Sequence, residues 1–103
     1  MWMTSILVPA SAPINLVADT IGSRFVILSW LLPAIPNGVI TSYTITYNLT
    51  GESTSVIVQT GEQYTVSGLN PYSYYQFTAF ASTAVGDGPP TLPITLRTAV
   101  ASE

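Results

Sequence analysis

The sequence contains no cysteine, no histidine and no lysine. Without cysteine it forms no disulfide and offers no thiolate ligand to a metal. Without histidine it lacks the most frequent general base of enzymes and a common zinc ligand. Arg24 and Arg97 are its only cations, too few to neutralise the phosphates of a nucleic acid or an anionic lipid surface. We therefore expect neither nucleic-acid binding nor attraction to a charged membrane.

Acidic residues are also sparse. The chain of 103 residues has five, which together with the two arginines give a formal net charge of −3. They are scattered along the sequence, whereas a calcium site needs several oxygen ligands close together. Function has to be argued from a site, and the sequence shows none. We predict no catalytic residue, no cofactor, no metal ion and no enzyme activity.

Long apolar runs are missing too, although 48% of the residues are hydrophobic. No run approaches the ~20 residues that span a bilayer, so we expect no direct membrane insertion. The first nine residues include no basic residue, and their apolar stretch is too short for a signal peptide. We predict an N-terminal linker or strand extension over residues 1–11, one domain over 12–99 and a C-terminal tail over 100–103.

The sequence does contain short runs rich in Val, Ile, Thr, Tyr and Phe. Prolines and glycines separate these runs at intervals of about 8–12 residues, the spacing typical of a sandwich or barrel. No helix pattern appears. The runs predict strands over about 14–18, 24–30, 40–48, 54–59, 64–69, 74–83 and 93–98. We therefore predict an all-β fold, a seven-stranded antiparallel sandwich of two sheets that is immunoglobulin-like.

Alternation along these strands predicts which side chains face the core. Val26, Leu28 and Trp30 share one face of their strand, which makes Trp30 a core residue rather than a platform for a sugar. Residues of the opposite parity face outward, where an apolar patch indicates an interface unless neighbouring segments cover it. We predict a candidate interaction surface of seven outward residues: Phe25, Ile27, Thr44, Thr46, Tyr74, Thr78 and Phe80.

Two expected turns carry short motifs. Asn48-Leu49-Thr50 is an N-glycosylation sequon, which makes Asn48 a candidate glycosylation site, although a chain rich in Thr and Asn also produces this triplet by chance. Val85-Gly86-Asp87 precedes the last strand and is a candidate loop contact. The same residues also fit an ordinary turn, since glycine allows positive φ.

Several motifs agree in order and spacing with one known family. Val26-Ile27-Leu28-Ser29-Trp30 is similar to its second strand. Tyr64-Thr65-Val66-Ser67-Gly68-Leu69-Asn70-Pro71, leading to Tyr75, is similar to its tyrosine corner, in which a buried tyrosine hydroxyl bonds to backbone a few residues upstream. Over about residues 12–98 the chain resembles the fibronectin type III domain family. Tyr72 and Thr83 depart from the glycine and asparagine that are common in the family at these positions.

The resemblance implies a non-catalytic extracellular module for protein interaction or adhesion in a larger multidomain receptor or matrix protein. Its contacts would be a protein partner, neighbouring modules of the same chain, or a second copy through self-association. A passive spacer in a secreted carbohydrate-active enzyme is the alternative. An intracellular muscle-type module fits less well, because we expect more charge there. Some family members present Arg-Gly-Asp where this chain has Val85-Gly86-Asp87, and Val85 removes the arginine.

Overall fold

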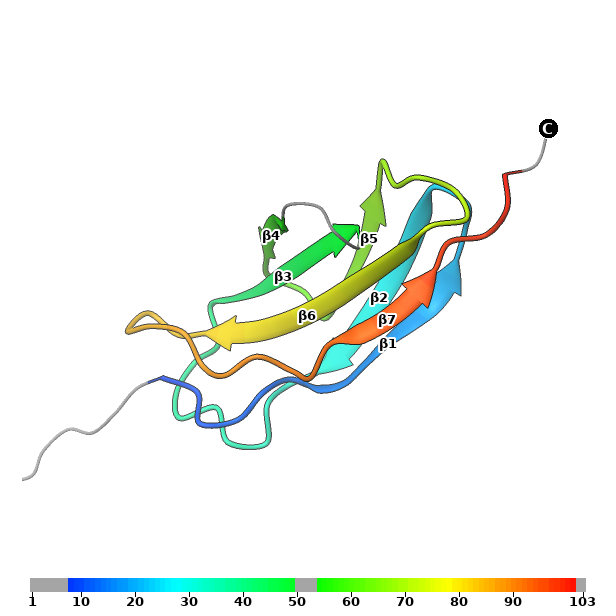
Figure 1. The fold of residues 1–103 in the computed structure, drawn as a ribbon. Helices are drawn as coiled ribbons and strands as arrows, with labels where there is room; N and C mark the ends of the chain where they lie inside the picture. Colours follow the sequence, from blue (N-terminus) through cyan, green and yellow to red (C-terminus); the bar gives the residue numbers. More distant parts are fainter. Residues whose placement is uncertain (1–7, 50–53, 102–103) are drawn as a thin grey trace, which may run out of the picture.

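A computed structural model of the protein describes residues 8–49 and 54–101, apart from the side chains of residues 55–57. β1, β2 and β5 form a three-stranded antiparallel sheet, and β4, β3, β6 and β7 form a four-stranded antiparallel sheet in that order (Figure 1). The predicted all-β, two-sheet sandwich is confirmed. The strands are β1 (Ile14–Ile21), β2 (Phe25–Leu31), β3 (Ser42–Leu49), β4 (Ser55–Gln59), β5 (Gln63–Ser67), β6 (Tyr74–Ser82) and β7 (Ile94–Arg97).

Most strand ends differ from the sequence prediction by one or two residues, and three of the differences have a clear structural basis. β1 continues to Ile21 through two irregularities in its pairing with β2, which a simple alternation pattern does not reveal. β5 ends at Ser67, so Leu69 packs into the core from the connection that follows. β3 runs to Leu49 because β6 is long enough to keep pairing with it, and Asn48 lies opposite Gln76. The strand predicted as far as Asn48 is confirmed and runs one residue further, so the turn that was predicted from Asn48 does not begin at that residue.

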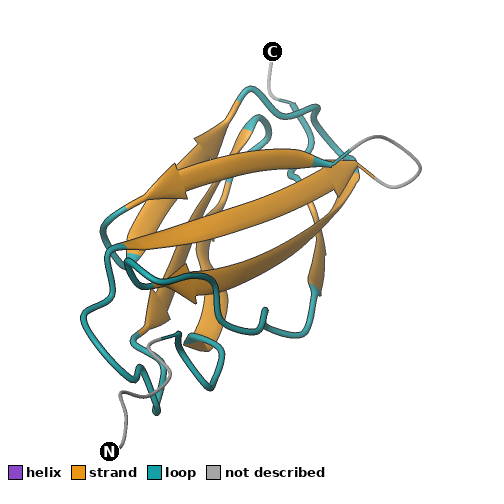
Figure 2. Ribbon diagram, turned by 90° about the vertical axis from the view of Figure 1, so that its left-hand side faces the viewer, coloured by secondary structure: helices purple, strands orange, loops and turns teal. Residues whose placement is uncertain are grey.

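The two sheets lie face to face as two layers (Figure 2). Side chains from both sheets fill one core between them. Val26 and Leu28 have no exposed surface, which confirms the predicted alternation in β2. The ring of Trp30 meets Tyr43 edge-on across the two sheets, with ring centroids 5.5 Å apart. The buried hydrophobic residues are Leu16, Val26, Leu28, Trp30, Tyr43, Ile45, Val66, Leu69, Tyr75, Phe77, Ala79 and Ala81.

A hydrogen-bonded corner joins the β5–β6 connection to the chain that follows β7. The Tyr75 hydroxyl accepts a hydrogen bond from the Asn70 backbone N–H at 2.8 Å, which confirms the tyrosine corner. The Thr98 hydroxyl accepts from the Ser73 N–H at 2.9 Å and donates to the Asn70 carbonyl at 2.6 Å. These side chains therefore satisfy backbone groups of a connection that has no strand partner.

Tyr43 places a hydroxyl in the core that has no hydrogen-bond partner among the described residues. Burial raises the pKa of Tyr43 to about 12, and the Glu62 carboxylate acts in the same direction. The neutral hydroxyl is therefore the stable form in the folded protein.

The stability of the protein is expected to fall between about pH 10 and pH 12. An unfolded chain ionises tyrosine near pH ~10, whereas Tyr43 in the folded state keeps its proton up to about 12. In this window the folded state binds more protons, so the free energy of unfolding decreases as pH rises, by roughly 3 kcal/mol in total. Urea unfolding of the natural protein and of Tyr43→Phe across this range measures the effect. Equal losses in both proteins would contradict this assignment to Tyr43.

Within residues 8–49 and 54–101 there is no helix long and apolar enough to cross a membrane.

Candidate functional site

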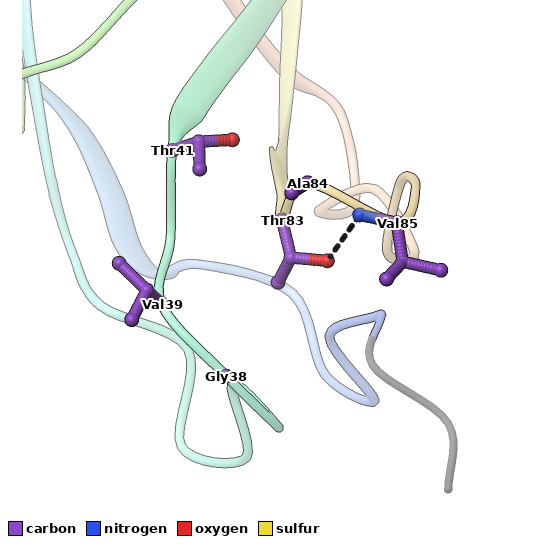
Figure 3. A pocket seen from close by; sticks show the side chains of 6 residues that line it. All are labelled: Gly38, Val39, Thr41, Thr83, Ala84 and Val85. Atoms are coloured by element: carbon purple, nitrogen blue, oxygen red, sulfur yellow. Dashed lines mark hydrogen bonds between the residues drawn. The ribbon is translucent and has the colours of Figure 1, made fainter. Parts of the chain in front are cut away.

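An apolar pocket of about 170 Å³ lies at one end of the sandwich, between the β2–β3 and β6–β7 connections. Its volume is comparable with the ~150 Å³ cavity that holds a benzene ring. Val39 flanks it on one side and Val85 on the other (Figure 3). These two side chains are 80% and 61% exposed. The lining residues are Gly38, Val39, Thr41, Thr83, Ala84 and Val85.

The β2–β3 connection presents Val39 because of the turn that precedes it. Asn37 and Gly38 both have positive φ, 57° and 151°. Asparagine tolerates the left-handed region better than most residues, and glycine adopts it without strain. The Asn37 side-chain amide donates a hydrogen bond to the Val8 carbonyl at 3.1 Å, which ties this turn to the N-terminal segment. The turn therefore directs Val39 away from the core.

Backbone and side-chain hydrogen bonds fix the β6–β7 connection. The Thr83 N–H donates to the Gly86 carbonyl at 3.0 Å, and the Val85 N–H donates to the Thr83 hydroxyl at 3.2 Å. Asp87 accepts a hydrogen bond from the Ser82 hydroxyl at 2.6 Å. The Asp87 carboxylate therefore has a structural partner within its own loop, and Val85 is held at the rim of the pocket.

The N-terminal segment passes beside the pocket. Pro9 is buried against Gly88, where an added Cβ would lie 2.6 Å from the Pro9 Cβ. The Val8 side chain lies close to Gly86, and the Ala10 N–H donates to the Ile35 carbonyl at 2.9 Å. Residues 8–11 therefore pack on the sandwich, next to the site that the two loops form.

The pocket suits an apolar side chain. Both of its threonine hydroxyls interact with backbone: Thr41 donates to the Ser82 carbonyl at 3.2 Å, and Thr83 accepts from Val85. The remaining lining groups are methyl groups and glycine backbone. Burying apolar surface stabilises by about 25 cal/mol per Å². No group of three or more His, Cys, Asp or Glu residues that could hold a metal occurs in the described part of the chain.

The seven residues of the predicted interaction surface lie on opposite faces of the molecule. Phe25 and Ile27 belong to the three-stranded sheet, and the other five belong to β3 and β6 of the four-stranded sheet. Thr44 is only 8% exposed, because Val58 and Phe80 flank it on the neighbouring strands. Tyr74 is 53% exposed, and the remaining five are half-buried. The structure therefore does not join these residues into one patch, and Thr44 offers little contact area.

The predicted sequon lies on the outer face of β3. The Asn48 side chain is half-buried beside Gln76, and Thr50 falls outside the described residues. Glycosylation of Asn48 stays a prediction.

Of the three loop residues predicted as a contact, Val85 lines the pocket, while Asp87 bonds to Ser82. Sequence reasoning missed Val39 and Thr41. The signal that could have found Val39 is the Asn37-Gly38 turn, which directs the next side chain outward. The pairing of Val39 with Val85 depends on contacts between loops more than 40 residues apart in the sequence, and no local pattern contains it.

Most of the chain is similar to known proteins. Residues 11–97 match the family model "Fibronectin type III domain". The chain is 35% identical over 81 residues to "Cell adhesion molecule Dscam1" of Drosophila melanogaster, which covers 75% of this chain and 4% of that protein. It is 34% identical over 92 residues to "Netrin receptor DCC" of Homo sapiens, covering 85% of this chain and 6% of that protein. The chain therefore spans only a small part of these relatives.

A solved structure shows the same fold. The third fibronectin III domain of the human KIAA0343 protein superposes with a TM-score of 0.85, covering 100% of this chain and 93% of that one. The two sequences are 20% identical, so this likeness supports the fold alone.

Proposed function

The chain belongs to the fibronectin type III family, and on that basis we propose that it is an extracellular protein-interaction module of a larger receptor or adhesion protein. The domain itself is non-catalytic. Two relatives, named as a cell adhesion molecule and a netrin receptor, contain a similar domain as a few per cent of their length. Because such a domain makes up so little of its parent protein, the segments that lie next to it are mostly other parts of that same protein.

The apolar pocket between Val39 and Val85 carries this proposal. Exposed apolar side chains are ordinary when single, but here two of them flank a hollow with no unpaired polar side chain in its lining. The occupant we propose is an apolar side chain of the module that precedes this one in the parent protein. The path of residues 8–11 supports this, because a preceding module would be joined through a segment that passes the pocket.

Hydrogen–deuterium exchange of the whole parent protein and of this chain alone tests the proposal. We expect the amides of residues 38–41 and 83–86 to exchange more slowly in the parent, since a neighbouring side chain excludes water there. Val39→Ser with Val85→Ser should weaken the contact about tenfold, which corresponds to ~1.4 kcal/mol. Both residues are largely exposed, so the double variant should change the stability of the domain itself by less than ~1 kcal/mol.

Leu92→Ser is the matched control. Leu92 is 86% exposed in the same β6–β7 connection but does not line the pocket. Exchange rates equal in the parent and the isolated chain would contradict the proposal. Loss of protection in Leu92→Ser equal to that in the Val39 and Val85 variant would contradict the assignment of the contact to the pocket.

A further inference from the structure

Arg97, at the end of β7, lies against two tyrosine rings at the opposite end of the molecule from the pocket. Its guanidinium carbon is 4.1 Å from the centroid of the Tyr72 ring and 5.3 Å from that of Tyr74. Tyr72 and Tyr74 are 56% and 53% exposed, and Arg97 is exposed as well. We call these three residues the tyrosine–arginine cluster. It lies near the C-terminal end of the described chain, where β7 ends and β6 begins (Figure 1).

The backbone holds both sides of the cluster in place. Tyr74 and Arg97 are direct partners in the pairing of β6 with β7. The Tyr72 N–H donates to the Ala99 carbonyl at 3.0 Å, and the Thr98 N–H donates to the Ser73 carbonyl at 2.9 Å. Immobilising a long side chain costs about 0.5–1.5 kcal/mol on binding. Arg97 is already stacked in the free protein, so much of that cost is absent when a ligand arrives.

Tyr72 takes part in the cluster in spite of its backbone. Its φ is 51°, in the left-handed region that costs a residue with a side chain about 1–2 kcal/mol. The contact of Arg97 with its ring offsets part of this cost, because a cation over an exposed aromatic face contributes about 0.5–1 kcal/mol. Tyr72 therefore adopts an unfavourable backbone conformation and provides a second ring for the guanidinium of Arg97.

No carboxylate of the described residues forms an ion pair with Arg97, whose guanidinium lies over the two rings. Asp87 bridges Ser82 at the far end of β6, and the Tyr74–Ser82 strand spans about 3.3 Å per residue, so the two charges lie ~25–30 Å apart. Glu62 precedes β5, at that same far end of the sandwich. Asp19, near the end of β1, is the one described carboxylate at the same end as Arg97, and no ion pair joins the two. Among the described residues the guanidinium of Arg97 therefore has no carboxylate partner in direct contact.

We propose that the tyrosine–arginine cluster binds a carboxylate side chain in an acidic segment of a partner protein. A guanidinium that stacks on aromatic rings still has N–H donors along its edge, and these match a carboxylate in a planar, paired geometry. Tyrosine and arginine are also the residues that most often dominate protein interfaces. This inference rests on the proposed function, and it names a second contact surface distinct from the pocket.

Nuclear magnetic resonance titration of the 15N-labelled protein with a hexaglutamate peptide tests the inference. We expect shifts confined to residues 72–76 and 94–99, and weaker binding as salt rises, because an exposed charge pair is screened. Arg97→Gln should weaken binding at least fivefold. Arg97→Lys keeps the charge but not the planar fork, and should weaken it about threefold.

Arg24→Gln is the matched control, because Arg24 lies at the same end of the sandwich and has no aromatic partner among the described residues. Binding in this variant should not change. Equal losses for the two arginines, or shifts spread over the surface, would overturn the inference. A heparin hexasaccharide that shifts the same residues with tenfold higher affinity would also overturn it in favour of a sulfated glycan.

Each Arg97 variant counts only if its spectrum outside the cluster is the same as that of the natural protein, which shows that the variant is folded. If Arg97→Gln unfolds, the result for Arg97→Lys decides the test. The exchange test at Val39 and Val85 does not involve Arg97. If the peptide does not bind but the pocket is protected from exchange in the parent, this inference fails and the proposed function stands. If the peptide binds but the pocket is not protected, the pocket contact fails and the binding role of the cluster stands.

Discussion

Phe77→Ala is expected to lower the free energy of unfolding by about 3–5 kcal/mol. Phe77 has no exposed surface and lies near the middle of β6, one of the two inner strands of the four-stranded sheet. Its ring stacks on Tyr47 with centroids 5.6 Å apart and meets Tyr75 at 6.2 Å. Removing it leaves a cavity between the two sheets and ends both ring contacts. Urea unfolding followed by tryptophan fluorescence measures the loss.

Phe80→Ala is the matched control for this prediction. Phe80 lies on the same strand three residues on, faces outward and is half-buried. Because it borders solvent, its loss should cost only about 1 kcal/mol. Equal losses for the two phenylalanines would contradict the assignment of Phe77 to the single core and of Phe80 to the outer face.

Thr98→Val is expected to lower the free energy of unfolding by roughly 2–4 kcal/mol, although valine has nearly the same shape. Thr98 is 2% exposed, and its hydroxyl serves the Ser73 N–H and the Asn70 carbonyl together. Valine removes the hydroxyl and leaves both backbone groups without this partner in a site that admits little water. The cost of leaving each such group unsatisfied is about 1–3 kcal/mol. Thermal and urea unfolding both report it.

Thr95→Val makes the same chemical change on the exposed side of β7. The exposed Thr95 hydroxyl can bond to water in both the folded and the unfolded chain. We therefore expect its removal to change the free energy of unfolding by no more than ~0.5 kcal/mol. A loss in Thr98→Val no larger than that in Thr95→Val would show that the corner does not depend on the Thr98 hydroxyl. Alternation along the predicted strand places Thr98 on the face of Ile94 and Leu96 and Thr95 on the other face, but no sequence pattern shows that the Thr98 hydroxyl bonds to the β5–β6 connection.

The fold was predictable because its signals are local. Val26, Leu28 and Trp30 alternate with outward residues, and the segment from Tyr64 to Tyr75 contains the whole tyrosine corner. What could not be predicted depends on pairing between distant strands. Thr44 looks like a solvent residue in its own strand, but Val58 and Phe80 enclose it once β3 lies between β4 and β6. Leu49 belongs to β3, one residue beyond the predicted strand, because β6 extends far enough to pair with it.

The candidate sites, like the fold, were predictable only where the signal lies within one stretch of the sequence. Val85 was singled out in the sequence as part of a loop motif, but its partner Val39 comes from a loop between other strands. The sequence marks Tyr72 as a departure from glycine and Arg97 as one of two cations, but no pattern in it places the guanidinium over the ring. Both surfaces require the register of β6 with its neighbours, which alternation alone does not determine.

We propose that this domain contacts a neighbouring protein module through the pocket between Val39 and Val85. The most direct measurement is an experimental structure of the parent protein that includes the module preceding this one. We expect an apolar side chain of that module in the pocket, in contact with both valines. A parent in which the pocket faces solvent, or in which no module precedes this domain, would contradict the claim.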